Sequence, residues 1–209
     1  DSWEDMENAP ESYRKMNEEA KWPGRFPKRG FQDMQAAYWG LCSQMDAAIG
    51  DIMKQVDLIE PLFIYSSDHG DYQGRRGRMF KMPVIPMDDI SKVPYFACGY
   101  GVPKGARVEN PVGLVDIAPT FLTAAGLPVP EQLDGVALQK YFKNTEFGDD
   151  RTVYCYGEAG FDMVKMGKMK YFAHHTTDEE MLFDLENDPH ELKNIADDPQ
   201  WSKVKADLA

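Results

Sequence analysis

The chain has 209 residues with a formal net charge of −12, and 43% of its residues are apolar. This length and composition suit one domain with a substantial core plus a small second one, and they argue against a chain that is disordered throughout. The acidic balance argues against binding to nucleic acid or to a membrane surface, because contacts with phosphate need a basic face. No apolar run approaches the length that spans a bilayer.

Three cysteines lie far apart, at Cys42, Cys98 and Cys155, and none has the close spacing of a metal-binding pair. An odd number of cysteines cannot all pair as disulfides. We therefore expect reduced or buried thiols that behave as small apolar residues, and the compartment of the protein stays open.

The first thirty residues predict an acidic and mostly irregular segment. Residues 11–20 can form a short helix, whereas the prolines and glycines between Trp22 and Gly30 interrupt any periodicity. Such an opening is unusual at the beginning of a domain. We therefore expect the chain to be the later part of a larger protein.

Residues 33–56 predict an amphipathic helix, because apolar side chains recur there at helical spacing. The apolar stripe consists of Met34, Ala37, Tyr38, Leu41, Met45, Ala48, Ile49, Ile52, Met53 and Val56. We expect the stripe to face the core, and we expect Gly50 within it to allow close packing rather than to break the helix. An apolar strand over 62–65 follows directly, so the two elements point to an α/β layer.

A second strand and a second helix follow a glycine-punctuated loop over 71–87. Residues 92–99 predict a short buried strand, and Asp116 is expected to cap a helix over 117–125 that stops at Gly126. The side chains expected on the buried face of this helix are Ile117, Phe121, Leu122 and Ala125.

The chain changes character near Lys143, where a polar linker over 144–151 begins. Beyond the linker, Gly167 and Lys168 suit a tight hairpin turn, and Asp198 followed by proline suits the start of a final helix. The strand-like pieces are residues 152–156, 163–166, 169–173 and 181–185. This order predicts a small antiparallel sheet with a helix packed on it.

The residues with the clearest chemical potential are Asp68 and His69, which follow the strand over 62–65. In open α/β sheets, ligands bind in the crevice beyond the carboxyl ends of the strands. The plainer interpretation is a carboxylate that caps a turn beside a surface imidazole. A metal site is equally compatible, because an aspartate oxygen suits Ca²⁺ or Mg²⁺ and an imidazole suits Zn²⁺ or Mn²⁺. Its remaining ligands would come from elsewhere.

A basic group follows this pair, with Arg75, Arg76, Arg78 and Lys81 close together in an acidic chain. Each arginine alone would suit a solvated loop. Beside a cation, however, the lysine would complete an anion pocket that stabilises charge developing on a sulfuryl or phosphoryl group. These residues therefore indicate a metal-dependent hydrolase or transferase that acts on an oxyanion ester.

The same run resembles the sulfatase signature in the alkaline phosphatase superfamily. Ser67-Asp68-His69-Gly70 resembles its S-D-H-G, and Lys81 stands thirteen positions after Asp68, like the lysine of the signature. Other segments resemble the family in order from about residue 33 to 198. They are Gly74 and Gly77, Tyr38 to Ile52, Lys92-Val93-Pro94, Val115 to Thr120, Ala125 to Pro128, Leu133-Asp134-Gly135 and Met181 to Asn194.

The resemblance implies the C-terminal part of a sulfatase of the arylsulfatase or choline-sulfatase kind. Residues 1–143 would be the remainder of an alkaline-phosphatase-like α/β sandwich, and residues 144–209 a small C-terminal antiparallel sheet with a packed helix. Asp68 and His69 would bind a divalent cation, usually Ca²⁺, with Mg²⁺ or Mn²⁺ as alternatives. Lys81 would be the catalytic contact with the sulfate of a small-molecule ester. Arg76, where the family commonly has a histidine, is also expected to contact the substrate.

Several features of the family are missing. No C-x-P-S-R or C-x-A-G-R segment is present, so no cysteine of this chain can become the formylglycine nucleophile. The family's paired aspartates and its mid-chain histidine motif are also absent, and Asp88-Asp89 replace its paired glutamates. We therefore expect an inactive piece of a parent that hydrolyses sulfate monoesters through formylglycine. Two alternatives are a phosphate or phosphonate ester hydrolase of the same superfamily and a non-catalytic binding protein.

Overall fold

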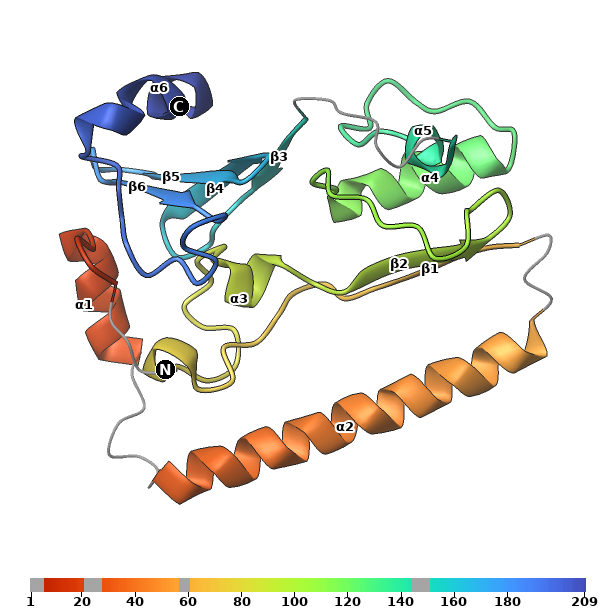
Figure 1. Ribbon diagram of the computed structural model, residues 1–209, viewed down its shortest axis with the longest axis horizontal. Helices are drawn as coiled ribbons and strands as arrows, with labels where there is room; N and C mark the ends of the chain where they lie inside the picture. Colours follow the sequence, from red (N-terminus) through yellow and green to blue (C-terminus); the bar gives the residue numbers. More distant parts are fainter. Residues whose placement is uncertain (1–5, 21–27, 57–60, 144–150) are drawn as a thin grey trace. The chain divides into compact units, whose positions relative to one another are not determined.

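The computed structural model describes residues 6–20, 28–56, 61–143 and 151–209 (Figure 1). They belong to two compact units. Unit 1 comprises Asp1–Trp39, His69–Lys92 and Thr152–Ala209, and unit 2 comprises Gly40–Asp68 and Val93–Arg151. The division into domains at residue 143 stays a prediction. Most of the expected linker, and most of the break expected between Trp22 and Gly30, lie outside the described residues.

Unit 1 is built on a four-stranded antiparallel sheet with strand order β3-β4-β5-β6. The strands are β3 (Thr152–Cys155), β4 (Phe161–Met166), β5 (Met169–His174) and β6 (Glu180–Asp184). Met166 pairs with Met169 across a two-residue turn, in which Gly167 has a positive φ of 54°. Glycine adopts this left-handed conformation without a steric penalty. The predicted strands and the predicted hairpin are therefore confirmed.

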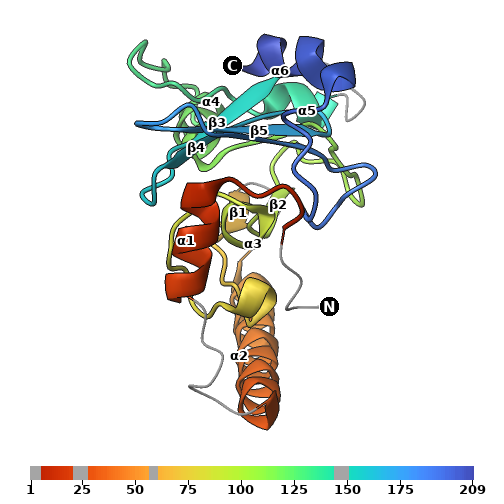
Figure 2. The same ribbon diagram turned by 90° about the vertical axis from the view of Figure 1, so that its left-hand side faces the viewer.

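The two faces of this sheet carry separate apolar cores. Figures 1 and 2 show helix α1 (Glu11–Ala20) on one side of the sheet and helix α6 (Ser202–Leu208) on the other. Phe161, Phe172 and Phe183 are completely buried on the α1 side, together with Tyr13 of the helix. The core on the α6 side consists of Tyr171, Leu182, Ala196 and Leu208. Alternation along each strand sends successive side chains to opposite faces, which explains the two cores.

The final helix begins as expected from the sequence. The side chain of Asp198 accepts a hydrogen bond from the backbone N–H of Gln200 at 3.1 Å, and Pro199 opens the 3₁₀ turn η3 (Pro199–Trp201) that leads into α6. Trp201 and Val204 pack against the core on the α6 side of the sheet. The predicted cap, proline and buried helix face are confirmed.

A long loop, His69–Lys92, completes unit 1 and carries the predicted basic group. It contains the 3₁₀ turn η1 (Arg75–Gly77) and the short helix α3 (Asp88–Ser91). The backbone N–H of Gly70 donates to the carbonyl of Ile90 at 2.8 Å, so the two ends of the loop are joined. The loop is therefore a closed structure within unit 1.

Unit 2 contains a two-stranded sheet and the helix predicted after Asp116. Strands β1 (Leu62–Ser66) and β2 (Tyr95–Gly99) pair antiparallel, with Leu62 opposite Gly99. The 3₁₀ turn η2 (Leu114–Asp116) precedes α4 (Ile117–Ala124), and α5 (Gln139–Lys143) follows later. Both predicted strands are present, but β2 begins at Tyr95 rather than Lys92 and, contrary to the prediction, none of its residues is buried. The helix stop at Gly126, which has a φ of +70°, is confirmed.

Helix α4 differs from the prediction in its cap and in its buried face. The Asp116 side chain makes no capping bond to α4. It accepts instead from the backbone N–H of Gly113, before the turn η2, and from groups much later in the chain. The buried positions of α4 are Pro119 and Thr120. Phe121, which was expected to be buried, is 42% exposed. The chain folds back on the Thr120 side, where the backbone N–H of Leu138 donates to the Thr120 hydroxyl at 3.0 Å.

Helix α2 (Lys28–Gln55) confirms the predicted helix and begins five residues earlier, but its apolar stripe was wrongly expected to be buried. Leu41, Met45 and Ile52 are all more than half exposed, and a Cβ built on Gly50 meets no described atom within 4 Å apart from the neighbouring backbone of the helix itself. The helix periodicity fixes a stripe but not the partner that covers it. Among the described residues, no helix is long and apolar enough to cross a membrane.

Candidate functional site

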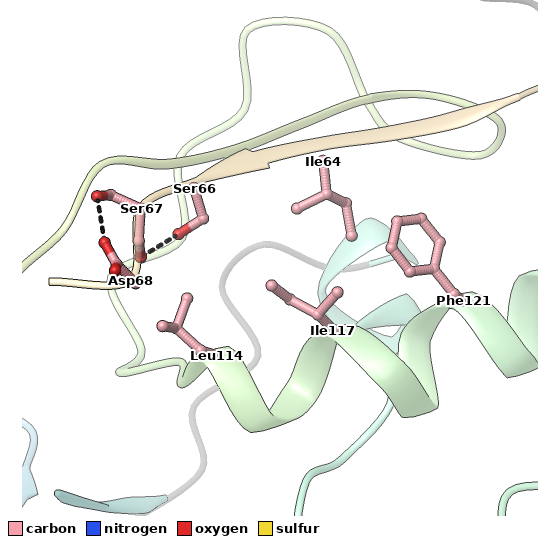
Figure 3. A pocket seen from close by; sticks show the side chains of 7 residues that line it. All are labelled: Ile64, Ser66, Ser67, Asp68, Leu114, Ile117 and Phe121. Atoms are coloured by element: carbon pink, nitrogen blue, oxygen red, sulfur yellow. Dashed lines mark hydrogen bonds between the residues drawn. The ribbon is translucent and has the colours of Figure 1, made fainter.

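The end of strand β1 borders an open pocket in unit 2. The pocket has a volume of about 280 Å³, and its wall is formed by the strand end on one side and by the start of α4 on the other (Figure 3). Its lining residues are Ile64, Ser66, Ser67, Asp68, Leu114, Ile117 and Phe121. Figure 3 shows the polar side chains gathered at the end of β1, whereas the apolar ones come from the strand at Ile64 and from the opposite wall at Leu114, Ile117 and Phe121. The exposed carboxylate of Asp68 therefore marks the polar end of this pocket.

Hydroxyl groups hold the backbone and the carboxylate at this strand end. The Ser66 hydroxyl donates to the carbonyl of Pro94 at 3.0 Å, which ties the end of β1 to the residue before β2. The Ser67 hydroxyl donates to Oδ1 of Asp68 at 3.3 Å. Asp68 thus has an oriented carboxylate that is accessible to solvent, which is what a ligand for a hard cation needs.

His69 lies at the start of the closed loop of unit 1, and its ring is oriented by its own neighbour. Nδ1 of His69 lies 2.8 Å from the carbonyl oxygen of Gly70. Because a carbonyl only accepts, this contact selects the tautomer with a proton on Nδ1 and a lone pair on Nε2. Histidines that bind metals commonly have this arrangement, in which one ring nitrogen donates to a carbonyl and the other faces the ion.

Gly70 is required by the close approach of two backbone segments. A Cβ atom built at Gly70 would overlap the carbonyl oxygen of Asp89. The glycine of the S-D-H-G run therefore permits the loop to close directly after His69. Within the described residues, no three histidine, cysteine or carboxylate side chains are grouped closely enough to hold a metal ion.

Lys81 is exposed and follows a narrow hairpin within the closed loop. The backbone N–H of Tyr72 donates to the carbonyl of Phe80 at 2.9 Å, and the Tyr72 hydroxyl donates to the carbonyl of Pro83 at 3.0 Å. These two bonds fix the backbone on both sides of Lys81. An ammonium group on a fixed backbone is suited to contact an anion at a defined place.

Arg78 is completely buried, and its contacts give it a structural role. Its guanidinium lies 5.1 Å from the ring centroids of both Tyr13 and Tyr72, and its Nε donates to Oδ1 of Asn17 at 2.7 Å. Burial raises the pKa of Tyr72 to about 12, against the lowering effect of the Arg78 charge. Arg78 therefore anchors the loop against α1, which excludes it from contact with an ester in solution.

Arg76 is also buried, although the sequence predicts a contact with substrate. Its Nε donates to Oδ2 of Asp89 at 3.1 Å, and its Nη2 donates to the carbonyl of His190 at 2.7 Å. Burial alone would lower the pKa of this guanidinium, but the charges around it, including those of Glu191 and Asp89, raise it overall. Arg76 adopts a left-handed backbone with a φ of 55°, and its role with substrate stays a prediction.

The partners of Arg76 belong to a buried charge network that the sequence analysis missed. Lys170 of β5 is completely buried and lies 2.7 Å from Oε1 of Glu191 and 2.8 Å from Oδ1 of Asp88. The other oxygen of Glu191 accepts from the backbone N–H of Asp88 at 2.8 Å. The network joins the closed loop to the sheet of unit 1. Glu191 lies in a segment that resembles the family, whereas no sequence signal marks Lys170.

A second buried carboxylate organises unit 2 beside the pocket. Asp116 is completely buried, and its two oxygens accept from the backbone N–H groups of Gly113 and Val136, each at 2.8 Å, and from Nη2 of Arg151 at 2.6 Å. Burial first, and then the Asp116 charge, raise the pKa of Tyr95 to about 12. Asp116 therefore holds the start of α4, which forms one wall of the pocket.

The structure distributes the predicted site residues over the two units. Asp68 belongs to unit 2, whereas His69, Arg76 and Lys81 belong to unit 1 and lie on the one closed loop. Of these, Asp68 and Lys81 are exposed, and the Arg76 side chain is only 3% exposed.

Solved structures of known proteins identify the class of this fold. The phosphonate monoester hydrolase of Silicibacter pomeroyi matches 98% of this chain and 48% of its own chain, with a TM-score of 0.79 and 20% sequence identity. A Bacteroides thetaiotaomicron protein described as a sulfatase matches 93% of this chain and 44% of its own, with a TM-score of 0.72 and 23% identity. The fold is that of the alkaline-phosphatase-like hydrolases, as predicted.

The family follows from the sequence matches. The sulfatase family model matches residues 5–127, and the model for the C-terminal region of N-sulphoglucosamine sulphohydrolase matches residues 92–209. Arylsulfatase K of Homo sapiens is 33% identical over 192 residues, and choline-sulfatase of Rhizobium meliloti is 32% identical over 182. These matches cover 83% and 82% of this chain, respectively, and 35% of each relative. The chain belongs to the sulfatase family and spans about a third of the length of these relatives.

Proposed function

We propose that the whole protein hydrolyses sulfate monoesters of small molecules. The observation that carries this proposal is the S-D-H-G run with its lysine at Lys81, found in a chain that the sulfatase model matches over residues 5–127. The relatives named arylsulfatase K and choline-sulfatase support the same reaction. A solved structure with a TM-score of 0.60 and 21% identity is in complex with its substrate D-glucosamine-2-N,6-O-disulfate, which supports a small sulfated substrate.

Asp68 and His69 are the residues of this chain that would hold a divalent cation. Ca²⁺ is the first choice and Mg²⁺ or Mn²⁺ are the alternatives, because hard cations prefer carboxylate oxygen. The accessible carboxylate of Asp68 and the imidazole of His69, whose Nδ1 is directed at the carbonyl of Gly70, both fit this role. A bound cation would supply positive charge that stabilises the negative charge developing on a transferring sulfuryl group. The remaining ligands lie outside this chain.

Lys81 would contact the sulfate oxygens as the catalytic cation of this chain. Its exposed ammonium and its fixed backbone support this role. The nucleophile is not in this chain, and we propose a formylglycine in the rest of the protein. Arg76 takes no part in the proposal, because its guanidinium is held by buried partners.

Two other functions compete with this proposal. The phosphonate monoester hydrolase with the same fold favours cleavage of a phosphonate or phosphate ester by similar metal and lysine groups. The missing nucleophile leaves room for a protein that only binds. The residue of the intact reading frame that aligns with the family's nucleophile decides between catalysis and binding, because an active parent needs a cysteine there for conversion to formylglycine.

The direct test compares substrates of two classes in the whole protein. We expect turnover of an aryl sulfate, loss of it on metal chelation, and a fall in kcat/KM of about a hundredfold or more in Lys81→Met, since removing one charge-stabilising group costs about this much. Lys104→Met, an exposed lysine outside the loop, is the matched control. Preferential cleavage of an aryl phosphodiester would overturn the sulfatase assignment. Sulfatase turnover by the 209-residue chain alone would instead overturn the expectation that this piece is inactive because its nucleophile lies outside it.

A further inference from the structure

Lys81, the predicted sulfate contact, stands between two exposed apolar side chains. Phe80 is 53% exposed and Met82 is 55% exposed. The interior of the same closed loop has apolar side chains that are at most 4% exposed, at Tyr72, Met79, Ile85, Met87 and Ile90. We call Phe80, Lys81 and Met82 the loop tip. The large apolar side chains that this loop exposes are therefore the two neighbours of Lys81.

The backbone at Phe80 explains how the loop tip projects. Phe80 has a φ of 60°, in the left-handed region. In an extended segment every second side chain points to the same side, so Met79 and Lys81 would face the same way. Met79 is instead buried while Lys81 is exposed, because the left-handed turn interrupts this alternation. The backbone N–H of Tyr72 donates to the Phe80 carbonyl at 2.9 Å, which holds the turn.

A phenylalanine is a costly residue for this turn. A left-handed backbone crowds the Cβ atom of most residues, whereas glycine and asparagine adopt it more readily. Arg76 and Glu191 also have a positive φ, but their side chains are buried in the charge network. The Phe80 ring is more than half exposed, so burial offsets less of its cost. Strained backbone of this kind clusters at active sites and ligand contacts.

The two apolar side chains limit the kind of group that can lie beside Lys81. The Phe80 ring has no hydrogen-bonding group, and Met82 has only a weakly accepting sulfur. A hydroxyl-rich group against them would lose hydrogen bonds to water without replacement. An apolar group would gain from burial against both, and the flexible methionine adapts to different shapes. Exclusion of water would also strengthen the attraction between the ammonium and a sulfate.

A protein surface fits the loop tip less well than a small ester. Specific protein interfaces bury about 1,200–2,000 Å², and lysine is depleted in them. The loop tip instead has one lysine between two apolar side chains. Consecutive Cα atoms lie about 3.8 Å apart, so these side chains begin close enough together to contact both the sulfate and the organic group of one ester.

From this arrangement we infer that Phe80 and Met82 determine specificity by contacting the apolar aryl or alkyl group of a sulfate ester whose sulfate binds Lys81. The inference rests on the proposed sulfatase function and adds the chemical class of the alcohol. Phe80 provides a ring that stacks on an aryl group, and Met82 provides an adaptable second wall.

The test separates the organic group of the substrate from its sulfate. It measures KM of the whole protein for 4-nitrophenyl sulfate and the inhibition constant of inorganic sulfate, which has no organic group. Phe80→Asn removes the ring but suits the left-handed backbone. We expect it to raise KM about tenfold with little change in kcat, and to change the inhibition constant by less than about twofold. Met82→Ala should raise KM about threefold in the same way.

Three further variants serve as controls. Phe80→Tyr keeps the ring and should keep the KM of the natural protein. Lys81→Met should raise both KM and the inhibition constant, because both ligands contain the sulfate. Tyr100→Asn, at an aromatic residue of unit 2 that is 57% exposed, is the matched control for loss of an exposed ring and should change neither constant.

The outcomes separate this inference from the proposed function. Absence of turnover on every sulfate ester overturns both. Turnover of a sulfated sugar but not of 4-nitrophenyl sulfate leaves the proposed function standing and overturns the inference. An unchanged KM in both Phe80→Asn and Met82→Ala also overturns it. Equal weakening of 4-nitrophenyl sulfate and inorganic sulfate in Phe80→Asn does the same, because Phe80 would then act only through the backbone at Lys81.

Discussion

Lys170 and Glu191 form a buried ion pair, with Nζ of the lysine 2.7 Å from Oε1 of the carboxylate. Their side chains are 0% and 1% exposed. The pair joins a central strand of the unit 1 sheet to the segment that binds Arg76, and through Asp88 it reaches the far end of the Lys81 loop. Removing one partner would leave a charge without compensation in the interior, which is far more costly than the net value of the pair.

Lys170→Met should therefore destabilise the chain strongly. The change leaves two carboxylates without their shared cation, and we expect a loss of about 3–5 kcal/mol in the free energy of unfolding. Urea denaturation of the 209-residue chain measures this loss. Lys203→Met is the matched control, because its side chain is 92% exposed in a surface pair with Asp207 and should change stability by less than about 0.5 kcal/mol. Equal effects of the two substitutions would contradict the structural role of the network.

The charge of Asp88 should give this network a defined pH dependence. Burial would raise the pKa of this carboxyl, but the charge and hydrogen bond of Lys170 lower it below the ordinary value of 3.8. Because the folded pKa is the lower one, the contribution to stability is present above pH 3.8 and is lost as the pH falls through the folded value. Asp88→Asn should be less stable than the natural chain at pH 7, and the difference should shrink below pH 3.8.

Urea denaturation of both chains at a series of pH values tests whether the difference in stability shrinks at low pH. Asp207→Asn serves as the control, because that carboxylate is more than half exposed and its ammonium partner is 3.8 Å away. A difference between Asp88→Asn and the natural chain that grows as the pH falls would contradict the lowered pKa.

Local patterns predicted the local features of this molecule. Strand β1, the turn at Gly167 and the cap at Asp198 each depend on a few neighbouring residues, so a short stretch of sequence specifies them. The spacing from Asp68 to Lys81 likewise lies within one loop, and its resemblance to a family signature indicated the candidate site. These predictions required no knowledge of what packs against each element.

Contacts between residues that lie far apart in the chain explain the features that the sequence did not predict. Asp116 precedes a helix and has the right side chain for a cap, but Val136 and Arg151, much later in the chain, bind its Oδ1, and its Oδ2 accepts from Gly113 before the turn η2. The stripe of α2 is correctly periodic, yet periodicity says nothing about the presence of a covering surface. Lys170 lies between apolar strand residues, and only the fold brings it to Asp88 and Glu191.

Asp116→Ala should destabilise unit 2 and disturb the start of α4. The substitution leaves Arg151 without its carboxylate and removes the acceptor for two backbone N–H groups, which should cost about 3–5 kcal/mol. Asp51→Ala is the matched control, because that side chain is 75% exposed in helix α2. Urea denaturation followed by fluorescence measures both variants, and a loss for Asp116→Ala no larger than that for Asp51→Ala would argue against the buried role.

A substitution at Gly70 tests whether closure of the loop positions His69, the predicted metal ligand, and Lys81, the predicted sulfate contact. A side chain at Gly70 would displace the carbonyl of Asp89 and open the loop that starts at His69 and carries Lys81. We expect Gly70→Ala to lose about 1–3 kcal/mol of stability and to lower kcat/KM of the whole protein on an aryl sulfate. Gly50→Ala, where space is open in a helix, should instead gain up to about 1 kcal/mol. Urea denaturation and steady-state kinetics give the two readouts. If Gly70→Ala keeps full activity, closure at Gly70 is not what positions His69 and Lys81.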